Sequence, residues 1–280
     1  MIPAIPKLDT IEVKLHPTGV AEIIFNRPDR YNLMNNHVYG EWLAALDWAA
    51  ACDEVKVTVI TGRGKYYSSG KQLAMPEPMP ASSTSEEKIA ISSKSVTTTK
   101  ALVSGLINFP KLLIAAINGP AFGIAVTSMA LCDVVYSVPH ATFKTPFMQL
   151  GLCAEGCSSV LFPRIMGPSR ASEMLLMGRE FTAAELEQCG LVGRILPEKG
   201  FHEHVLKLAA DAAKFSLDAL KTTKKLIRDV DREMLMKTCD SEFDSLAVRR
   251  ISSEAIEGIR KFIEKSNMQK QQKKQLSAKL

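Results

Sequence analysis

Residues 112–156 read LLIAAINGPAFGIAVTSMALCDVVYSVPHATFKTPFMQLGLCAEG, and the first part of this stretch decides the fold. A short apolar strand at 112–117 leads into a glycine-containing turn at 118–125, and a helical run and a second strand at 134–138 follow. A strand that runs into such a turn and then a helix aims backbone N–H groups and a helix N-terminus at one point. Because that geometry suits a carbonyl oxygen that becomes an anion, the stretch indicates an enzyme that stabilises an oxyanion and moves a proton with a carboxylate.

The chain before this stretch reads as strands separated by helices. Residues 11–25 alternate around a Pro-Thr-Gly turn and predict a hairpin, and residues 55–61 form a β-branched strand. Residues 38–49 carry apolar side chains at helical spacing, and Thr84 with Glu87 forms the capping box of a later helix. Strands that alternate with helices predict an α/β fold with crossover connections.

From about residue 158 the strand signals nearly vanish. Helical patterns cover residues 162–166, 169–177, 183–189, 201–213, 217–230 and 241–265. We therefore predict three parts, which are a core domain at 1–200, a helical region at 201–265 that packs on the core or on a neighbouring subunit, and a flexible basic tail at 266–280.

Composition and charge exclude several classes of protein. Of the 280 residues, 46% are hydrophobic and 23% are charged, which is ordinary for a soluble globular protein. The net charge of +5 resides in residues 261–280, which hold six lysines and one glutamate, so the rest of the chain offers no basic surface for nucleic acid. No apolar run reaches the ~18 residues of a membrane span. The six scattered cysteines lack a zinc-binding pattern and indicate reduced, mostly buried thiols.

Several motifs, in order along the chain, resemble one family. SSG at 68–70, NGPAFG at 118–123 and GLV at 190–192 look like the crotonase (enoyl-CoA hydratase/isomerase) superfamily, and the resemblance covers about residues 9–265. TPF at 145–147 and EGCSS at 155–159 are similar to one branch, the peroxisomal Δ3,Δ2-enoyl-CoA isomerases. The resemblance implies an α/β fold with a crotonase-like ββα spiral core, a C-terminal α-helical region, and a homotrimer or hexamer.

The resemblance also implies an oxyanion hole made of two peptide N–H groups. By position they belong to Lys71, which follows Ser69-Gly70, and to Ile124, which follows Gly123. Many relatives have a small residue at the first position and glycine at the second, but any residue except proline supplies a backbone N–H. We expect the Lys71 side chain to be exposed, with its ammonium group in water.

Glu155 matches the catalytic glutamate of the isomerase branch. Hydratases of the family place two glutamates around the substrate, at positions that Thr127 and Phe147 hold here. Adding water needs one group to activate the water and another to protonate carbon, so hydration is disfavoured. Isomerisation of a 3-enoyl thioester needs only one base, which removes a C2 proton and returns it at C4. Apolar neighbours such as Leu150 and Leu152 are expected to raise the pKa of Glu155.

The CoA site implied by the resemblance includes the segment after the SSG motif. Its substrate-binding residues are Ser69, Gly70, Lys71, Gln72, Leu73 and Ile124. Arg27 and Arg30 lie on the loop where relatives meet the CoA phosphates, which suit a guanidinium group; a solvated surface position is the alternative for both. The resemblance implies no metal and no cofactor, because the CoA is part of the acyl-CoA thioester substrate.

The chain ends in Ala278-Lys279-Leu280, a conservative variant of the Ser-Lys-Leu peroxisomal address. Because this tripeptide ends a polar tail that a receptor can reach, we expect binding by the peroxisomal import receptor and a location in the peroxisomal matrix. A generic lysine-rich tail is the alternative.

Two other functions stay open. One is another crotonase activity, such as an enoyl-CoA hydratase, a dienoyl-CoA isomerase or a thioesterase, and the residues at 127 and 147 weigh against the first two. The other is a non-catalytic acyl-CoA-binding module whose basic tail serves a protein or nucleic-acid partner. Glu155, the oxyanion turn and the neutral body together favour a Δ3,Δ2-enoyl-CoA isomerase of unsaturated fatty-acid β-oxidation.

Overall fold

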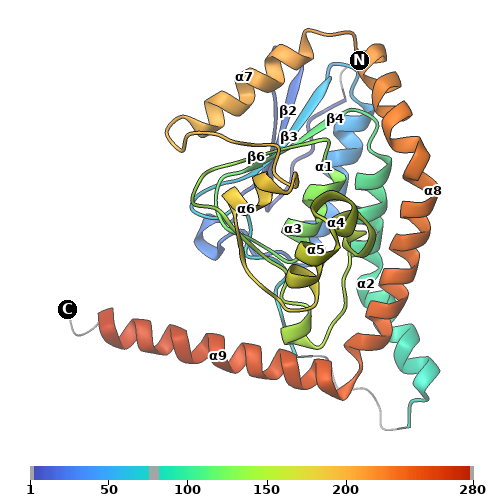
Figure 1. Ribbon diagram of the computed structural model, residues 1–280, viewed down its shortest axis with the longest axis vertical. Coiled ribbons are helices and arrows are strands. Elements are labelled where there is room, and N and C mark those ends of the chain that lie inside the picture. Colours follow the sequence, from blue (N-terminus) through green and yellow to red (C-terminus); the bar gives the residue numbers. More distant parts are fainter. Residues whose placement is uncertain (1–2, 76–81, 278–280) are drawn as a thin grey trace.

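The computed structural model describes residues 3–75 and 82–277, and a six-stranded sheet lies at its centre (Figure 1). In spatial order its strands are β1 (Ile11–Leu15), β2 (Val20–Phe25), β3 (Val57–Gly62), β4 (Leu112–Ile117), β6 (Val134–Ser137) and β9 (Arg194–Ile195). β1 and β2 form the predicted antiparallel hairpin, and every later pair is parallel. All residues of β2 and β3 are buried, which is typical of a parallel sheet that is covered on both faces.

A smaller sheet begins just after the chain leaves β4 of the large sheet. Its strands are β5 (Ala121–Phe122), β7 (Thr142–Lys144) and β8 (Phe181–Thr182), with β7 in the middle. β5 follows β4 after only the Asn118-Gly119-Pro120 turn. Glycine is required in this turn, because a Cβ at Gly119 would lie 2.1 Å from the carbonyl oxygen of Lys65. The predicted α/β core with crossover connections is confirmed.

The two long helices of the N-terminal half both begin at capping residues, of which only the second was predicted. α1 (Asn36–Ala51) begins after Asn35, whose side chain accepts a hydrogen bond from the Val38 N–H, and α2 (Ser85–Asn108) begins with the predicted capping box. The other helical segments are α3 (Ile124–Thr127), α4 (Ser158–Met166), α5 (Pro168–Leu175), α6 (Ala183–Gln188), α7 (Phe201–Ala213) and the short 3-10 turns η1 (Pro28–Arg30), η2 (Ser128–Leu131) and η3 (Met148–Leu150). None of the described helices combines the length and the apolar character that a membrane span needs.

The C-terminal region is helical, as predicted, but its boundaries differ. The predicted helices at 217–230 and 241–265 belong to two longer ones, α8 (Leu217–Arg250), which runs along α2, and α9 (Ser253–Ser277) (Figure 1). The chain turns between them, where the Ser252 hydroxyl accepts a hydrogen bond from the Ala255 N–H. The prediction of a flexible tail from residue 266 was wrong up to Ser277, because α9 continues through it. Ala278-Lys279-Leu280 lies outside the described residues, and the division at residue 200 stays a prediction.

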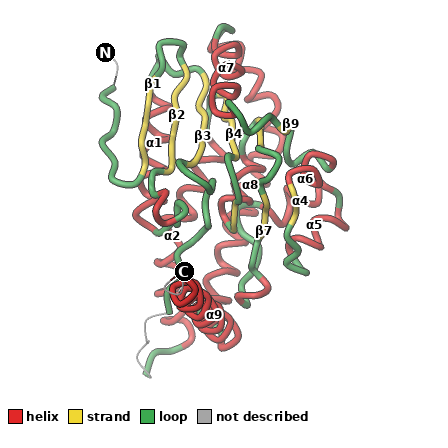
Figure 2. Tube along the Cα trace, turned by 90° about the vertical axis from the view of Figure 1, so that its left-hand side faces the viewer, coloured by secondary structure: helices red, strands yellow, loops and turns green. Residues whose placement is uncertain are grey.

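Only the first turns of α9 pack on the body; the rest of the helix projects away from it in Figure 1 and is seen nearly end-on in Figure 2. Ala255 and Ile259 are buried there. The approach to η3 is close, because a Cβ at Gly258 would lie 2.8 Å from the Leu150 backbone. At Gly151, which has φ +65°, a Cβ would lie 2.9 Å from Ala255. The base of α9 therefore supports the segment that leads to Glu155.

A buried carboxylate links α7 to the hairpin. Glu22 on β2 is 1% exposed, and its carboxylate lies 2.5 Å from His16 and 2.9 Å from His202 on α7. Burial alone would raise the pKa of Glu22, but hydrogen bonds from both histidines outweigh burial and lower it. The same hydrogen bond to Glu22 raises the pKa of His202. Sequence reasoning did not detect this cluster, because His202 lies far from His16 and Glu22 along the chain.

We expect His202→Gln to lower stability more at about pH 6 than at about pH 9. Because the pKa of His202 is raised on folding, its contribution to stability is fully present below the pKa of the unfolded state, about 6.5. This contribution is lost as pH rises through the pKa of the folded state. The lowered Glu22 pKa means that the Glu22 contribution is lost only as pH falls through its folded value. Because His202 is 44% exposed, the loss should be about 1 kcal/mol or less. Thermal unfolding, with exposed His204→Gln as the control, measures it; an equal loss at both pH values contradicts the assignment.

Candidate active site

Two turns from distant parts of the chain touch at the edge of the small sheet. The carbonyl of Ser68 accepts a hydrogen bond from the Phe122 N–H at 3.0 Å. Gly70 has φ +80° and lies so close that a Cβ on it would come within 2.7 Å of the Phe122 carbonyl oxygen. The turn that precedes Lys71 is therefore packed against the turn that precedes Ile124.

The N–H groups of Lys71 and Ile124 have no protein acceptor among the described residues. Lys71 lies opposite Met34, whose N–H donates to the Gly70 carbonyl at 2.9 Å and whose carbonyl accepts from the Gln72 N–H at 2.6 Å. This parallel pairing uses the groups on either side of Lys71 and turns its own N–H to the opposite edge. Ile124 is the first residue of α3, where an N–H has no intrahelical acceptor. The structure thus places both predicted oxyanion donors in touching turns.

Glu155 lies between η3 and α4, with its carboxyl group buried. It is 6% exposed, its Oε1 accepts a hydrogen bond from the Thr127 hydroxyl at 3.0 Å, and its Oε2 has no partner among the described residues. Gly156, at φ +70°, packs so tightly that a Cβ would lie 2.5 Å from the Thr127 hydroxyl oxygen. Thr127, on the same short helix as Ile124, therefore holds the carboxylate next to the oxyanion turn. Phe147, at the other position where hydratases carry glutamate, is also buried.

The surroundings of Glu155 adjust its basicity. Burial raises its pKa to about 7, and the nearby Glu242 carboxylate adds to the rise. The hydrogen bond from Thr127 and the positive charge of Lys71 act in the opposite direction. The rise was predicted from the apolar neighbours, but the part of Glu242 was not. A carboxyl group with this pKa can both accept and return a proton near neutral pH.

The Lys71 side chain is not in water, contrary to the sequence prediction. It is half-buried, and its ammonium nitrogen lies 5.7 Å from the ring centroid of Tyr39 in α1. Burial, followed by the positive charge of Arg250, lowers the Lys71 pKa to about 8, while Glu155 acts to raise it. The prediction failed because the pairing with Met34 just before α1 places Lys71 beside that helix rather than on a free loop.

Sequence reasoning missed Tyr39 and Arg250, which complete the surroundings of Lys71. Tyr39 is fully buried, and its hydroxyl has no hydrogen-bond partner among the described residues. Burial and the negative charge of Glu155 raise the Tyr39 pKa well above its usual value. Arg250 is the half-buried last residue of α8, and burial lowers its pKa. Tyr39 adjoins the predicted apolar stripe of its helix, whereas Arg250 carried no signal in the sequence.

The predicted CoA-binding residues lie on adjoining loops. The Ser69 N–H donates to the Tyr31 carbonyl at 2.9 Å, which joins the turn after β3 to the loop that carries both predicted arginines. Arg27 is half-buried, with its Nη1 donating to the Leu33 carbonyl at 2.9 Å, and Arg30 is exposed. Gln72 is exposed and Leu73 is half-buried. Their contact with CoA stays a prediction.

Away from this site, and within the described part of the chain, Asp9, His37 and Glu41 form a cluster of side chains that could bind a metal ion. The Glu41 carboxylate already accepts hydrogen bonds from the N–H groups of Asp9 at 2.7 Å and Thr10 at 2.8 Å. These bonds account for its buried position, since they fasten the segment before β1 to α1.

Comparison with known proteins identifies the family. The chain matches the family model described as enoyl-CoA hydratase/isomerase over residues 16–273, and it belongs to this family, the crotonases. The solved enoyl-CoA hydratase/isomerase of Pseudoalteromonas atlantica T6c has a TM-score of 0.82 at 27% identity, with 92% of this chain and 98% of that chain covered. Pseudomonas aeruginosa OdaA has a TM-score of 0.81 at 29% identity, with 91% and 98% covered. These likenesses confirm the crotonase-like fold with its C-terminal helical region.

Among curated relatives, human "Enoyl-CoA delta isomerase 2" is 39% identical over 249 residues, which are 89% of this chain and 62% of the human protein. Mouse "Enoyl-CoA delta isomerase 3, peroxisomal" is 39% identical over 236 residues, which are 84% of this chain and 72% of the mouse protein. Human "Testis-specific chromodomain protein Y 2" is 30% identical, with 88% of this chain and 45% of that protein covered. The chain thus spans less than two thirds of the human isomerase.

Proposed function

We propose that this chain is a Δ3,Δ2-enoyl-CoA isomerase that acts on unsaturated acyl chains during fatty-acid β-oxidation. The observation that carries the proposal is the pairing of one buried base with two unused N–H donors. Glu155 has an oxygen without a partner, and Thr127 fixes it to the helix whose first residue, Ile124, supplies one donor. The names of the human and mouse relatives support the same reaction.

In the proposed reaction the Glu155 carboxylate removes a proton from C2 of a 3-cis- or 3-trans-enoyl thioester. The C2–H electron pair forms the C2–C1 double bond of a dienolate, whose negative charge rests on the thioester oxygen. The N–H groups of Lys71 and Ile124 stabilise that charge. Glu155, now a carboxylic acid, returns the proton to C4 as the double bond forms between C2 and C3 in the 2-trans geometry. No cofactor takes part, because CoA belongs to the substrate.

The same residues disfavour hydration. A hydratase needs a second carboxylate to handle water, but Thr127 donates to Glu155 and Phe147 is apolar and buried. Glu242, the carboxylate that raises the pKa of Glu155, accepts hydrogen bonds from the N–H groups of Cys157 and Ser159 and is therefore occupied. A non-catalytic acyl-CoA-binding module is the second candidate, because one relative bears the name of a chromodomain protein and not that of an enzyme. The raised pKa of Glu155 favours catalysis over binding alone.

The direct test follows the ultraviolet absorbance of the conjugated thioester while the protein acts on a 3-enoyl-CoA. An isomerase raises this absorbance, and a hydratase offered 2-trans-enoyl-CoA lowers it. Calorimetric titration with the saturated acyl-CoA is run in parallel. Binding without turnover of either enoyl thioester supports the binding module and rejects the isomerase.

The proposal extends to the location and assembly of the protein. The name of the mouse relative and the terminal Ala278-Lys279-Leu280 favour the peroxisomal matrix and recognition by the import receptor. A homotrimer or hexamer agrees with a group of exposed apolar residues on α8 that includes Leu226, Ile227 and Val230. Light scattering after gel filtration measures the oligomer, and fluorescence of a tagged chain with a free C-terminus locates it.

We expect Lys71→Met to move the acid limb of the kcat profile to higher pH by about half a unit. The variant keeps the backbone N–H, so kcat at the plateau should stay within about threefold of wild type. It removes a positive charge that lowers the Glu155 pKa, so that pKa rises and the ionised base is lost at a higher pH. Exposed Lys65→Met is the matched control. An unchanged acid limb contradicts the expectation.

A further inference from the structure

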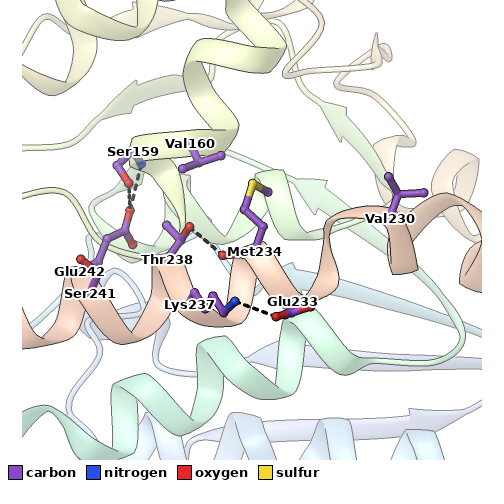
Figure 3. Close-up of a pocket in the computed structure, with 9 residues that line it drawn as sticks. All are labelled: Ser159, Val160, Val230, Glu233, Met234, Lys237, Thr238, Ser241 and Glu242. Atoms are coloured by element: carbon purple, nitrogen blue, oxygen red, sulfur yellow. Dashed lines mark hydrogen bonds and ion pairs between the residues drawn. The ribbon is translucent and has the colours of Figure 1, made fainter.

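Behind the Glu155 turn, α8 contributes a second buried carboxylate. Glu242 is 7% exposed; its Oε2 accepts a hydrogen bond from the Cys157 N–H at 2.7 Å, and its Oε1 accepts from the Ser159 N–H at 3.0 Å and from the Ser159 hydroxyl (Figure 3). Cys157 is the cap residue of α4, so Glu242 satisfies the first N–H groups of that helix from a different helix. A helix N-terminus favours a negative charge.

These bonds hold the backbone that carries Glu155. Gly156 has φ +70° and Cys157 has φ +60°, and a non-glycine residue keeps this left-handed conformation only where its neighbours fix it. α8 fixes it twice, because the Cys157 thiol also donates to the Leu235 carbonyl at 3.3 Å. Cys157 and Glu242 are 85 residues apart in the sequence, so the geometry of the turn depends on the docking of α8.

Glu242 lines a groove that is separate from the candidate site residues. It lies at the wall of a surface groove of about 680 Å³ between α4 and α8 (Figure 3), whose other lining residues include Val160, Met234 and Lys237. None of the lining residues belongs to the group of Tyr39, Lys71, Thr127 and Glu155. Glu242 acts on this group through its charge, which raises the pKa of Glu155.

The charge of Glu242 opposes the ionisation of Glu155. The charged and titratable groups around Glu155 are Lys71 in the turn after Gly70, Tyr39 in α1, Glu242 and Arg250 in α8, and Cys153 and Cys157 in its own segment. Lys71 lowers the Glu155 pKa, whereas ionised Glu242 raises it. Burial also raises the pKa of Glu242 itself, against the hydrogen bonds from Ser159 and Cys157, which lower it. Burial raises the pKa of both thiols and of the Tyr39 hydroxyl, so these three stay neutral near pH 7.

We propose that Glu242 is a positioning residue for Glu155, which holds the turn that carries the base and places a second negative charge behind it. The inference rests on the proposed role of Glu155. A purely structural Glu242 would change the rate or the stability only, whereas the proposed residue also sets the pH at which Glu155 ionises.

The test is Glu242→Gln, with Glu233→Gln as the matched control. Glu233 lies on the same helix and the same groove, but its side chain is 83% exposed and pairs with Lys237. The acid limb of kcat should move to lower pH by about half a unit or more in Glu242→Gln and stay in place in Glu233→Gln, because only the first variant removes a like charge that acts on Glu155. A lower kcat with an unmoved limb overturns the inference.

A second readout keeps this test separate from the proposed reaction. Carbon-13 NMR of glutamate-labelled protein follows the Glu155 carboxyl, which is assigned by its loss in Glu155→Gln. The midpoint of this titration should fall in Glu242→Gln even if no 3-enoyl-CoA is converted. If Glu242→Gln does not fold, Glu242→Asp keeps the charge but withdraws it by one methylene, so the midpoint should fall by less. An unchanged midpoint in the folded variant overturns the inference, whatever the activity assay shows.

Discussion

Replacing Glu155 by Gln is expected to lower kcat for 3-enoyl-CoA isomerisation by about 10²-fold or more. Glutamine has the same size and still accepts the hydrogen bond from the Thr127 hydroxyl, which spans 3.0 Å in the wild type. It cannot take a proton from C2 or return one to C4, because the amide is neutral and does not titrate near pH 7. Stopped-flow absorbance of the conjugated product measures the loss.

The position of the proton carrier makes this effect large. The described residues place no second free carboxylate beside the unpartnered oxygen of Glu155, since Glu242 is bonded to the start of α4. Affinity for a saturated acyl-CoA should stay within about threefold, because the binding surfaces are unchanged. A Glu155→Gln variant with wild-type kcat would remove Glu155 as the base.

Thr127→Val is a useful second variant, since it removes a hydrogen-bond donor that lowers the Glu155 pKa. It should move the acid limb of the kcat profile to higher pH, with a smaller loss of kcat than Glu155→Gln.

The elements that the sequence predicts well are those with local causes. The hairpin at 11–25, the capping box of Thr84 and Glu87, and the β-branched strand before Gly62 each depend on neighbouring residues, and each is present. The boundary between α8 and α9 near residue 250 was harder to predict, because α8 has a long polar face. The local signal at this boundary is Ser252, whose hydroxyl accepts a hydrogen bond from the first turn of α9. The tail from 266 was misread, since its polar composition is also compatible with a solvated helix.

The residues of the candidate site also fall into two groups, those predicted from local motifs and those that only the packing of the chain reveals. Lys71, Ile124 and Glu155 were predicted from motifs next to them in the chain, and the structure brings the touching turns and the buried carboxylate together, while their catalytic roles stay predictions. The groups that adjust the pKa of Glu155 were not found. Glu242 lies in α8, 85 residues after Cys157, whose N–H donates to it just behind the Glu155 turn. No local sequence pattern encodes such a contact. The motifs thus predict candidate site residues, whereas the packing of α1 and α8 sets the charges around them.

Replacing Gly70 by Ala is expected to lower kcat by about 10²-fold while the protein still folds. The added Cβ would lie 2.7 Å from the Phe122 carbonyl oxygen and 3.1 Å from its carbon, and both are backbone atoms that cannot rotate away. The φ of +80° adds a strain of about 1–3 kcal/mol for a residue with a side chain. Since the two turns meet at this contact, relief of the clash must separate the N–H of Lys71 from that of Ile124.

The oxyanion role is tested by which kinetic constant changes. If the N–H groups act on the dienolate, separating them weakens an interaction that is stronger in the transition state, so kcat falls more than affinity for a saturated acyl-CoA. Gly40→Ala is the matched control, because Gly40 lies in α1 with nothing within 4 Å of an added Cβ, and it should leave kcat unchanged. A folded Gly70→Ala variant that binds acyl-CoA poorly but keeps its kcat would place the turn in substrate binding alone. Equal losses of kcat and of unfolding temperature in both glycine variants would show a general defect of packing, and the contact between the two turns would then have no special part in the reaction.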